Sequence, residues 1–164
     1  MKRKYNLDQI GFVVNDINKI SNNLKKLIGV DEIKIVNWPI PGIDPESTHR
    51  GNKCNWKMRL GFLDTIDNVT LEFIQPIEGV SIFSEFLEAH SPGLHHLRFS
   101  VKDFDEAVED FIQEGYEMLA SGRGVHKGSR WAFFDTRSDY EGLIIELRTE
   151  LGKDAEKDQW LSND

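Results

Sequence analysis

The chain has 164 residues, of which 39% are apolar, enough for one globular domain or for two small modules that share a core. Its net charge of −8 argues against a nucleic-acid partner, because phosphate groups bind to basic surfaces. No apolar run approaches the ~18 residues of a membrane span, no signal segment follows Met1, and Cys54 is the only cysteine, which together favour a cytoplasmic protein without disulfides.

The first half of the chain predicts one strand, one helix and three further strands. Alternating apolar side chains mark the strands, which we expect at residues 7–14, 32–38, 56–64 and 69–75. The helix begins after Asp16, whose side chain can cap it, and ends at Gly29. Residues 39–55 contain three prolines and two glycines and predict a long loop, of the kind that often has a functional role.

The second half predicts the same order of elements after a linking helix at residues 80–90. Ser91-Pro92-Gly93 would end that helix, and Asp103 would cap the helix of the second half. The strands of this half are expected at residues 94–101, 116–120, 130–136 and 143–148. We therefore predict an α+β fold with a first βαβββ module, a linking segment, a second βαβββ module and a charged tail that frays, at residues 7–76, 77–93, 94–149 and 150–164.

Repeated sequence supports an internal duplication. Gly61-Phe62-Leu63-Asp64-Thr65 recurs as Ala132-Phe133-Phe134-Asp135-Thr136, and each copy precedes an apolar strand with a central glutamate. The openings of the halves also match, because Leu7-Asp8-Gln9-Ile10-Gly11 corresponds to Leu94-His95-His96-Leu97-Arg98. The duplication shows which residues occupy equivalent places in the two halves.

The alternation of side chains along these strands brings four polar residues to one face. Apolar residues such as Phe99 have the opposite parity and can face the helices. The two duplicated pairs of strands would form a cup, and one potential ligand from each strand would point into it: Gln9, Glu72, His96 and Glu146. The neighbouring His95 would point to the helix side, where a hydrogen-bonded structural role is expected.

These four side chains suit a divalent metal ion. Three oxygen donors and one imidazole match zinc, manganese, iron, cobalt or nickel, and two carboxylates offset the charge of the ion. The alternative is a polar cup without an ion. That alternative is less favourable because Glu72 and Glu146 would face each other unpaired and repel.

The duplicated unit resembles the vicinal oxygen chelate superfamily, which includes glyoxalase I, methylmalonyl-CoA epimerase, extradiol dioxygenases and bleomycin-resistance proteins. The resemblance covers residues 7–149 and is closest to the epimerases. The segments similar to that branch are Leu71-Glu72-Phe73-Ile74-Gln75-Pro76, Gly93-Leu94-His95-His96-Leu97 and Gly142-Leu143-Ile144-Ile145-Glu146-Leu147. It implies a metal-dependent enzyme that forms a homodimer and acts on a small-molecule substrate such as an acyl-CoA thioester.

The chain departs from the epimerase pattern at two places. The epimerases usually have histidine at the first ligand position, where this chain has Gln9, as some glyoxalase I enzymes do. The residues with which glyoxalase I holds glutathione are missing here, so glutathione is an unexpected substrate. The epimerases also use a glutamate base from the loop before the third strand, and Glu46 is the only glutamate in that loop, with His49 as an alternative.

Three functions are compatible with these residues. The first is a metal-dependent epimerase, isomerase or lyase that removes a proton next to a carbonyl of a small acid or acyl-CoA thioester, with Glu146 and Glu46 as proton carriers. The second is a small-molecule-binding protein of the same fold without catalysis. An iron dioxygenase ranks last, because it needs two histidines and a carboxylate and Gln9 replaces one of the histidines.

Overall fold

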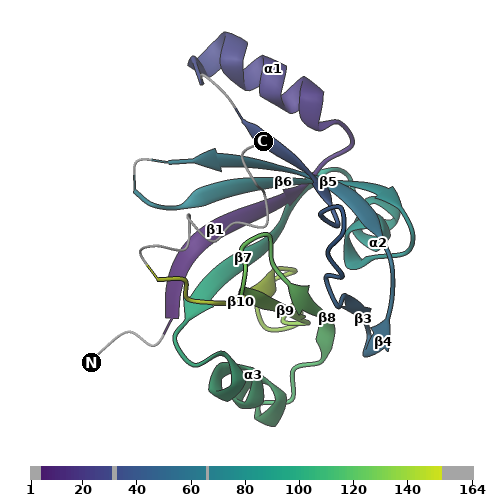
Figure 1. The fold of residues 1–164 in the computed structure, drawn as a ribbon, viewed down its shortest axis with the longest axis vertical. Coiled ribbons are helices and arrows are strands. Elements are labelled where there is room, and N and C mark those ends of the chain that lie inside the picture. Colours follow the sequence, from purple (N-terminus) through teal and green to yellow (C-terminus); the bar gives the residue numbers. More distant parts are fainter. Residues whose placement is uncertain (1–4, 31–32, 66, 153–164) are drawn as a thin grey trace.

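The computed structural model describes residues 5–30, 33–65 and 67–152 and is built around a strongly curved sheet (Figure 1). The sheet has ten strands in the order β2-β5-β6-β1-β7-β10-β9-β8-β3-β4. The charged tail predicted from residue 150 lies outside the described residues from position 153 onward. No helix among the described residues is long and apolar enough to cross a membrane.

The first βαβββ run consists of one helix and four long strands. They are β1 (Tyr5–Val13), α1 (Ile17–Ile28), β2 (Lys34–Trp38), β5 (Lys57–Asp64) and β6 (Thr70–Glu78). The helix begins where the sequence predicts, because the side chain of Asp16 accepts a hydrogen bond from the backbone N–H of Lys19 at 3.1 Å. It ends at Gly29, which adopts the left-handed conformation with φ of 74° and donates its N–H to the carbonyl of Lys25.

The second run repeats this order after the linking helix α2 (Ile82–Ala89). Its elements are β7 (Gly93–Val101), α3 (Phe104–Gln113), β8 (Met118–Arg123), β9 (Arg130–Phe134) and β10 (Ile144–Thr149). Asp103 caps α3 by accepting from the N–H of Glu106 at 3.0 Å. The expected α+β fold with a cup-shaped sheet is therefore confirmed.

The two runs meet at the centre of the sheet and are arranged symmetrically about that junction. β1 and β7 pair in antiparallel orientation, and each also pairs in parallel with the last strand of its own half, β6 or β10. The four central strands β6, β1, β7 and β10 are the strands on which the sequence places the four ligand candidates. Both halves therefore contribute neighbouring strands to the base of one cup.

The long loop before β5 contains two short strands that the sequence did not predict. β3 (Thr48–His49) and β4 (Asn52–Lys53) form a small hairpin, and β3 pairs with β8 of the second half. The hydroxyl of Thr48 lies 2.8 Å from that of Ser121 and accepts from the N–H of Ser121 at 3.1 Å. Strands of two residues show no alternation, and their partner lies in the other half, so local sequence patterns do not reveal them.

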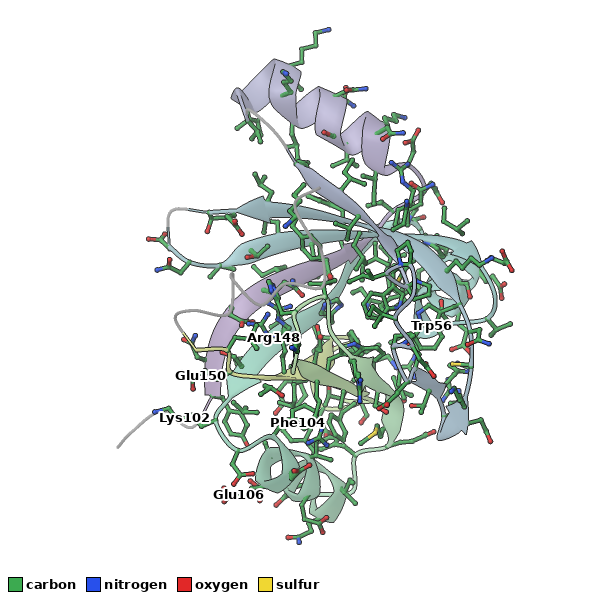
Figure 2. All side chains as sticks on the ribbon, in the orientation of Figure 1. Trp56, Lys102, Phe104, Glu106, Arg148 and Glu150 are labelled. Atoms are coloured by element: carbon green, nitrogen blue, oxygen red, sulfur yellow. The ribbon has the colours of Figure 1, made fainter. Side chains whose placement is uncertain are left out.

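Helices α1 and α3 cover one face of the sheet, as the alternation predicts, whereas α2 packs into the cup on the other face. Phe73 packs with Ile17 of α1 in one apolar cluster, and Phe99 packs with Phe104 of α3 in another. Figure 2 labels Phe104 on α3. On the other face, part of the cup is filled by an apolar cluster that includes Phe83 of α2 and three buried tryptophans, Trp38, Trp56 and Trp131. This filling leaves the opposite part of the cup available to polar side chains.

Candidate metal centre

The register of the central strands explains why four distant residues meet. Gly11 on β1 lies opposite Glu72 on β6 and opposite His96 on β7. In the neighbouring row of the sheet, Arg98 on β7 lies opposite Gln9 and Glu146. The four candidates thus occupy two adjacent rows on one face of the sheet.

Three of these residues form a tight cluster. Nε2 of His96 lies 3.1 Å from Oε2 of Glu146 and 3.4 Å from Oε2 of Glu72. One potential ligand atom from each of the three lies within 4.8 Å of the others. All three are buried, and so is Gln9, which is 1% exposed.

The hydrogen bonding of the cluster fits a metal ion. Among the described residues, Oε1 of Gln9 is buried without a hydrogen-bond partner, and Nε2 of His96 and Oε2 of Glu146 are buried and form the ion-pair contact of 3.1 Å without a well-aligned hydrogen bond. A buried polar atom without a partner costs free energy, so several such atoms in one place call for an explanation. An ion that accepts lone pairs from all of them would satisfy them together, and imidazole with carboxylate oxygens is a suitable donor set.

Without an ion, the cluster holds protons. Burial alone would lower the pKa of His96, but the carboxylates of Glu146 and Glu72 outweigh it and raise the pKa of this imidazole to about 9. Burial raises the pKa of Glu146 above its usual value. A metal ion would therefore have to displace a proton from His96, since only the neutral imidazole is a ligand.

Gly11 makes room for the imidazole of His96. A Cβ atom built on Gly11 would overlap the ring of His96 at Cε1, Nε2 and Nδ1. The glycine therefore serves close approach at this position rather than an unusual backbone angle. Any larger residue would displace the ring from the two carboxylates.

His95 does not follow the predicted alternation, because the pairing of β1 and β7 shifts register at this residue: Gly11 pairs with His96 and Phe12 with Leu94. The ring of His95 therefore lies beside His96, in contact with Phe83 and Phe133, which both line the cavity. Its ring packs against Phe83 and Phe86 of α2, with centroid distances of 5.2 and 5.1 Å. Nδ1 of His95 lies 3.0 Å from Nδ1 of His96, so one of these nitrogens donates to the other. Burial and the neighbouring His96 keep the pKa of His95 well below 6.5, so it is neutral and able to accept. Such a second partner fixes the orientation of a ligand histidine.

Two arginines stand beside the cluster and share one carboxylate. Nε of Arg98 donates to Oδ1 of Asp8 at 2.8 Å, and a terminal nitrogen of Arg148 lies 3.3 Å from Oδ2 of the same Asp8. The Arg98 and Arg148 side chains are 11% and 17% exposed. The two arginines were not among the predicted site residues, although each follows a ligand candidate by two positions and so shares its face of the strand.

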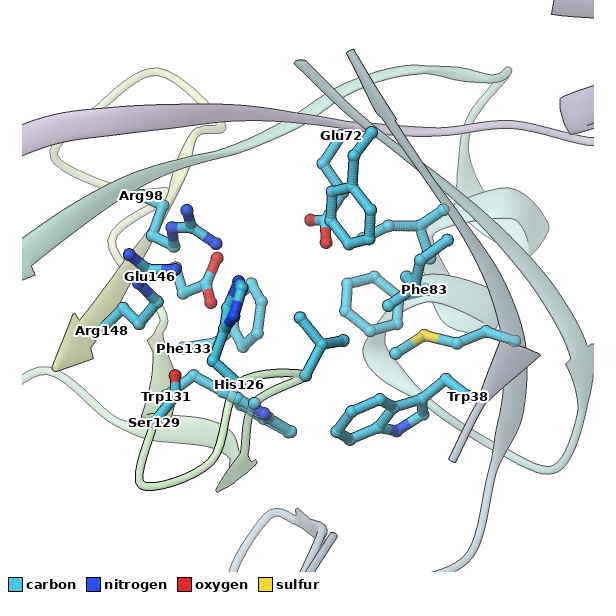
Figure 3. Close-up of a pocket in the computed structure, with 16 residues that line it drawn as sticks. Trp38, Glu72, Phe83, Arg98, His126, Ser129, Trp131, Phe133, Glu146 and Arg148 are labelled. Carbon is cyan, nitrogen blue, oxygen red and sulfur yellow. The ribbon is translucent and has the colours of Figure 1, made fainter. Parts of the chain in front are cut away.

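The ligand cluster borders a cavity with two different walls (Figure 3). Its volume is about 540 Å³ including the open mouth. Glu72, Glu146, Arg98 and Arg148 line the polar wall. The apolar wall consists of tryptophan, phenylalanine and aliphatic side chains: Trp38, Met58, Leu60, Phe62, Ile74, Phe83, Val125, Trp131 and Phe133. A ligand with one polar end and one apolar end fits these surroundings.

The structure does not bring Glu46 to the cluster. Its carboxylate pairs with Arg123 at 3.0 Å, its side chain is 59% exposed, and it does not line the cavity. His49, the alternative base, pairs with Glu85 at 2.9 Å. The loop that carries both residues runs to β8 at the far end of the sheet, which places them away from the ligands.

Comparison with known proteins agrees with the fold. Residues 8–133 match the family described as the Glyoxalase/Bleomycin resistance protein/Dioxygenase superfamily, whereas no curated protein matches the chain. A methylmalonyl-CoA epimerase of Mycobacterium tuberculosis is 21% identical with a TM-score of 0.66, and the match covers 93% of each chain.

Two further solved structures have the same fold. A methylmalonyl-CoA epimerase of Streptomyces coelicolor in complex with 2-nitronate-propionyl-CoA is 22% identical over 92% of this chain and 100% of that one, with a TM-score of 0.63. A hypothetical protein of Bacillus halodurans is 21% identical over 92% of this chain and 98% of that one, with a TM-score of 0.64. With most of its length matched and its duplicated βαβββ sheet, the chain belongs to the glyoxalase, bleomycin-resistance and dioxygenase superfamily, also called the vicinal oxygen chelate superfamily.

Proposed function

We propose that the protein is a metal-dependent enzyme of the epimerase or isomerase type, which removes a proton next to a carbonyl of a small acid or acyl-CoA thioester. The observation that supports this most is the burial of ligand atoms of Gln9, His96 and Glu146 that no well-aligned hydrogen bond satisfies in the described part of the chain. The atoms of His96 and Glu146 belong to the cluster with Glu72, beside a cavity that has room for a substrate, and the strand register places Gln9 on the same face.

Gln9, Glu72, His96 and Glu146 would hold the ion, with zinc, manganese, iron, cobalt and nickel as the candidates. A bound divalent ion would polarise a carbonyl and stabilise the negative charge that develops on its oxygen when the adjacent proton leaves. The chain itself contributes the neutral imidazole, held in orientation by His95, and two carboxylates that balance the charge of the ion.

Glu146 is the proposed proton carrier. It lines the cavity, and its Oε2, which lies 3.1 Å from Nε2 of His96, makes no well-aligned hydrogen bond among the described residues. Burial raises the pKa of Glu146 in the metal-free protein, whereas a bound divalent ion would favour its charged form. The walls of aromatic side chains would exclude water from the transferred proton.

An epimerase that acts on both faces of a carbon needs a second proton carrier. Among the described residues, the only carboxylates that line the cavity are Glu72 and Glu146. Glu46 therefore stays a predicted base, and a Glu46→Gln variant tests it. Loss of exchange in that variant, with metal content unchanged, would show that Glu46 takes part.

The substrate class is proposed from the similar structures. One of them binds 2-nitronate-propionyl-CoA, and another, a methylmalonyl-CoA epimerase, binds methylmalonyl-CoA. Both share the fold at 22% identity, so an acyl-CoA thioester is the first compound to test. A glyoxalase I-like lyase is the alternative for the ligand set of Gln9, Glu72, His96 and Glu146, although the glutathione-binding residues are missing.

A binding protein without catalysis is the second candidate. The large apolar wall around Trp38 and Trp131 favours it, because such surfaces bind aromatic or aliphatic compounds without any metal. Apart from the two ligand candidates Glu72 and Glu146, no carboxylate of the described residues lines the cavity, which also agrees with a binding protein. Metal content separates the two candidates, since only the enzyme needs an ion.

The decisive experiment combines metal analysis with proton exchange. Purified protein is loaded with each candidate metal in turn and incubated with methylmalonyl-CoA in deuterated buffer, and incorporation of deuterium at the α-carbon is followed by mass spectrometry. We expect one bound ion per chain and metal-dependent exchange that Glu146→Gln abolishes. A protein that takes up no metal, exchanges no proton and binds a small aromatic compound would establish the binding protein instead.

The protein is further proposed to form a homodimer. The sheet ends in the edge strands β2 and β4, and family resemblance implies a pair of chains. Light scattering at micromolar concentration should give twice the mass of one chain. A mass of a single chain would refute this expectation.

A further inference from the structure

We propose that Arg148, supported by Arg98 and Asp8, forms a subsite for a carboxylate of the ligand, so that the protein selects acids with an apolar group attached. This inference rests on the proposed function for the ion beside the subsite, but its evidence lies in different residues. The subsite explains two buried guanidinium groups that the metal cluster does not use.

Arg148 is incompletely paired for a buried guanidinium. Its contact with Asp8 is 3.3 Å long, and its Nε is buried with no hydrogen-bond partner in the described residues. Arginine presents five donors, and burying them without acceptors costs free energy. Asp8 cannot serve both arginines fully, because its Oδ1 already accepts from Nε of Arg98 at 2.8 Å.

The charges of this group are also unbalanced. Asp8 contributes one negative charge against the two positive charges of Arg98 and Arg148, which leaves one positive charge in excess. Glu72 and Glu146 do not correct the excess when a divalent ion takes up their two charges. A single carboxylate from a ligand would restore the balance in a site where burial strengthens the attraction.

The geometry of the cavity defines what is attached to that carboxylate. Figure 3 shows Arg98 and Arg148 on one side of the cavity and Trp38 and Phe83 on the other. Ser129 also lines the cavity on the side of Arg148, and its buried hydroxyl has no hydrogen-bond partner among the described residues. A carboxylate that meets the guanidinium would therefore direct its apolar substituent towards the aromatic wall.

The duplication supports a dedicated role for these arginines. The first half places Gly11 and Ile74 at the positions equivalent to Arg98 and Arg148. The fold itself therefore does not require a guanidinium at these places. The two guanidinium groups lie on one side of the cup only, which is the arrangement expected for recognition of one anionic group rather than for stability.

The test compares an acid with its uncharged amide. Metal-loaded protein is titrated by calorimetry with phenylacetate and with phenylacetamide, which have nearly the same shape but differ in charge. We expect the acid to bind at least about ten-fold more tightly, as charge-assisted hydrogen bonds predict. Arg148→Gln should reduce this preference to less than about two-fold, and Arg148→Lys should leave an intermediate preference because the forked donor geometry is lost.

Arg130→Gln is the matched control. It removes the same charge from the neighbouring strand β9, where Arg130 pairs with the exposed Asp105 at 2.8 Å outside the cavity. Its preference for the acid should equal that of the parent. Circular dichroism checks that each variant is folded, and the lysine variant keeps the test valid if the glutamine variant does not fold.

The outcomes distinguish this inference from the proposed function. A preference for the acid that survives in Arg148→Gln would overturn the subsite, because the carboxylate would then bind elsewhere, such as on the ion. Equal binding of acid and amide to the parent, or no binding of the acid at millimolar concentration, would also overturn it. Loss of proton exchange with an Arg148-dependent preference intact would instead refute the enzyme and leave the subsite standing.

Discussion

The two halves of the chain provide equivalent ligand positions but different walls of the cavity. Gln9 and Glu72 of the first half correspond to His96 and Glu146 of the second half. Around these positions the second half supplies the imidazole and both guanidinium groups. The first half supplies much of the apolar wall, through Trp38, Met58, Leu60, Phe62 and Ile74.

This difference teaches that one scaffold can separate two tasks. The backbone register fixes which positions point into the cup, and it is nearly the same in both halves. A side chain can then change in one half without moving the ligands of the other. The metal cluster thus consists of residues at equivalent positions of the two halves, whereas the polar and apolar walls of the cavity come from side chains that differ between the halves.

The largest expected effect comes from the first ligand position of each half. His96→Ala should abolish metal binding, whereas Gln9→Ala should weaken it less, because a neutral amide is the weaker ligand. His95→Ala should keep one ion per chain with about 10–100-fold lower affinity, since it loses only the supporting hydrogen bond. Metal content by mass spectrometry and affinity by calorimetry check this order, which equal losses in all three variants would contradict.

The next effect concerns the space that Gly11 leaves for the imidazole ring of His96. Gly11→Ala should destabilise the protein by about 1–3 kcal/mol and reduce metal binding, because the added methyl overlaps the imidazole. Gly93→Ala on the paired strand is the control, since a Cβ atom there meets nothing within 4 Å. Denaturant titration of both variants measures the difference. Equal stability of the two would mean that the ring is not confined by Gly11.

The stability of the metal-free protein should depend on pH through His96 and Glu146, which both belong to the second half. Metal-free protein holds a proton on His96 up to about pH 9, whereas the unfolded chain releases it near pH 6.5. Because the folded state binds the extra proton, stability is fully present below about pH 6.5 and is lost as pH rises towards 9. The raised pKa of Glu146 acts in the same direction. The loss is at most about 1.4 kcal/mol per pH unit for each proton.

Thermal unfolding of metal-free protein at several pH values checks this prediction. Metal affinity should show the opposite trend and increase with pH up to about 9, because the ion displaces the proton of His96. His96→Ala serves as the control and should flatten the stability profile. A metal-free protein whose stability is constant from pH 6.5 to 9 would show that His96 is neutral in the folded state.

The smallest expected effect concerns the contact between the halves at β3 and β8. Thr48→Val removes the hydroxyl that lies 2.8 Å from that of Ser121 and should cost about 1 kcal/mol. Thr70→Val removes an exposed hydrogen bond to Asp64 within the first half and should cost less. Chemical denaturation compares the two. A larger cost at Thr70 would indicate that the contact between halves contributes little.

Most of the cluster could be predicted because strand alternation is a local property. Glu72, His96 and Glu146 follow from the parity of three strands, and the register brings them within ligand distance. Asp8 could not be predicted in the same way. Simple alternation directs it away from Gln9, but the register of β1 shifts between Leu7 and Gln9 and allows Asp8 to reach the arginines.

The course of the long loop at residues 39–55 could not be predicted from the sequence either. It was expected to place Glu46 at the cavity, and the structure instead shows that residue with φ of 50°, paired with Arg123 of β8. The course of the loop depends on a partner strand in the other half, which no local pattern contains. Residues whose position depends on such distant pairing are the ones that the sequence alone does not place, and the role of Glu46 as a base stays a prediction.

That pairing also has a consequence for how the molecule unfolds. β3 belongs to the first half by its place in the chain but to the second half by its hydrogen bonds, which join residues 73 positions apart. Closing so long a loop costs conformational entropy that is recovered only when both halves are folded. The halves should therefore unfold cooperatively, in one transition that all spectroscopic probes report at the same midpoint. Neither half should keep its native structure when it is produced alone.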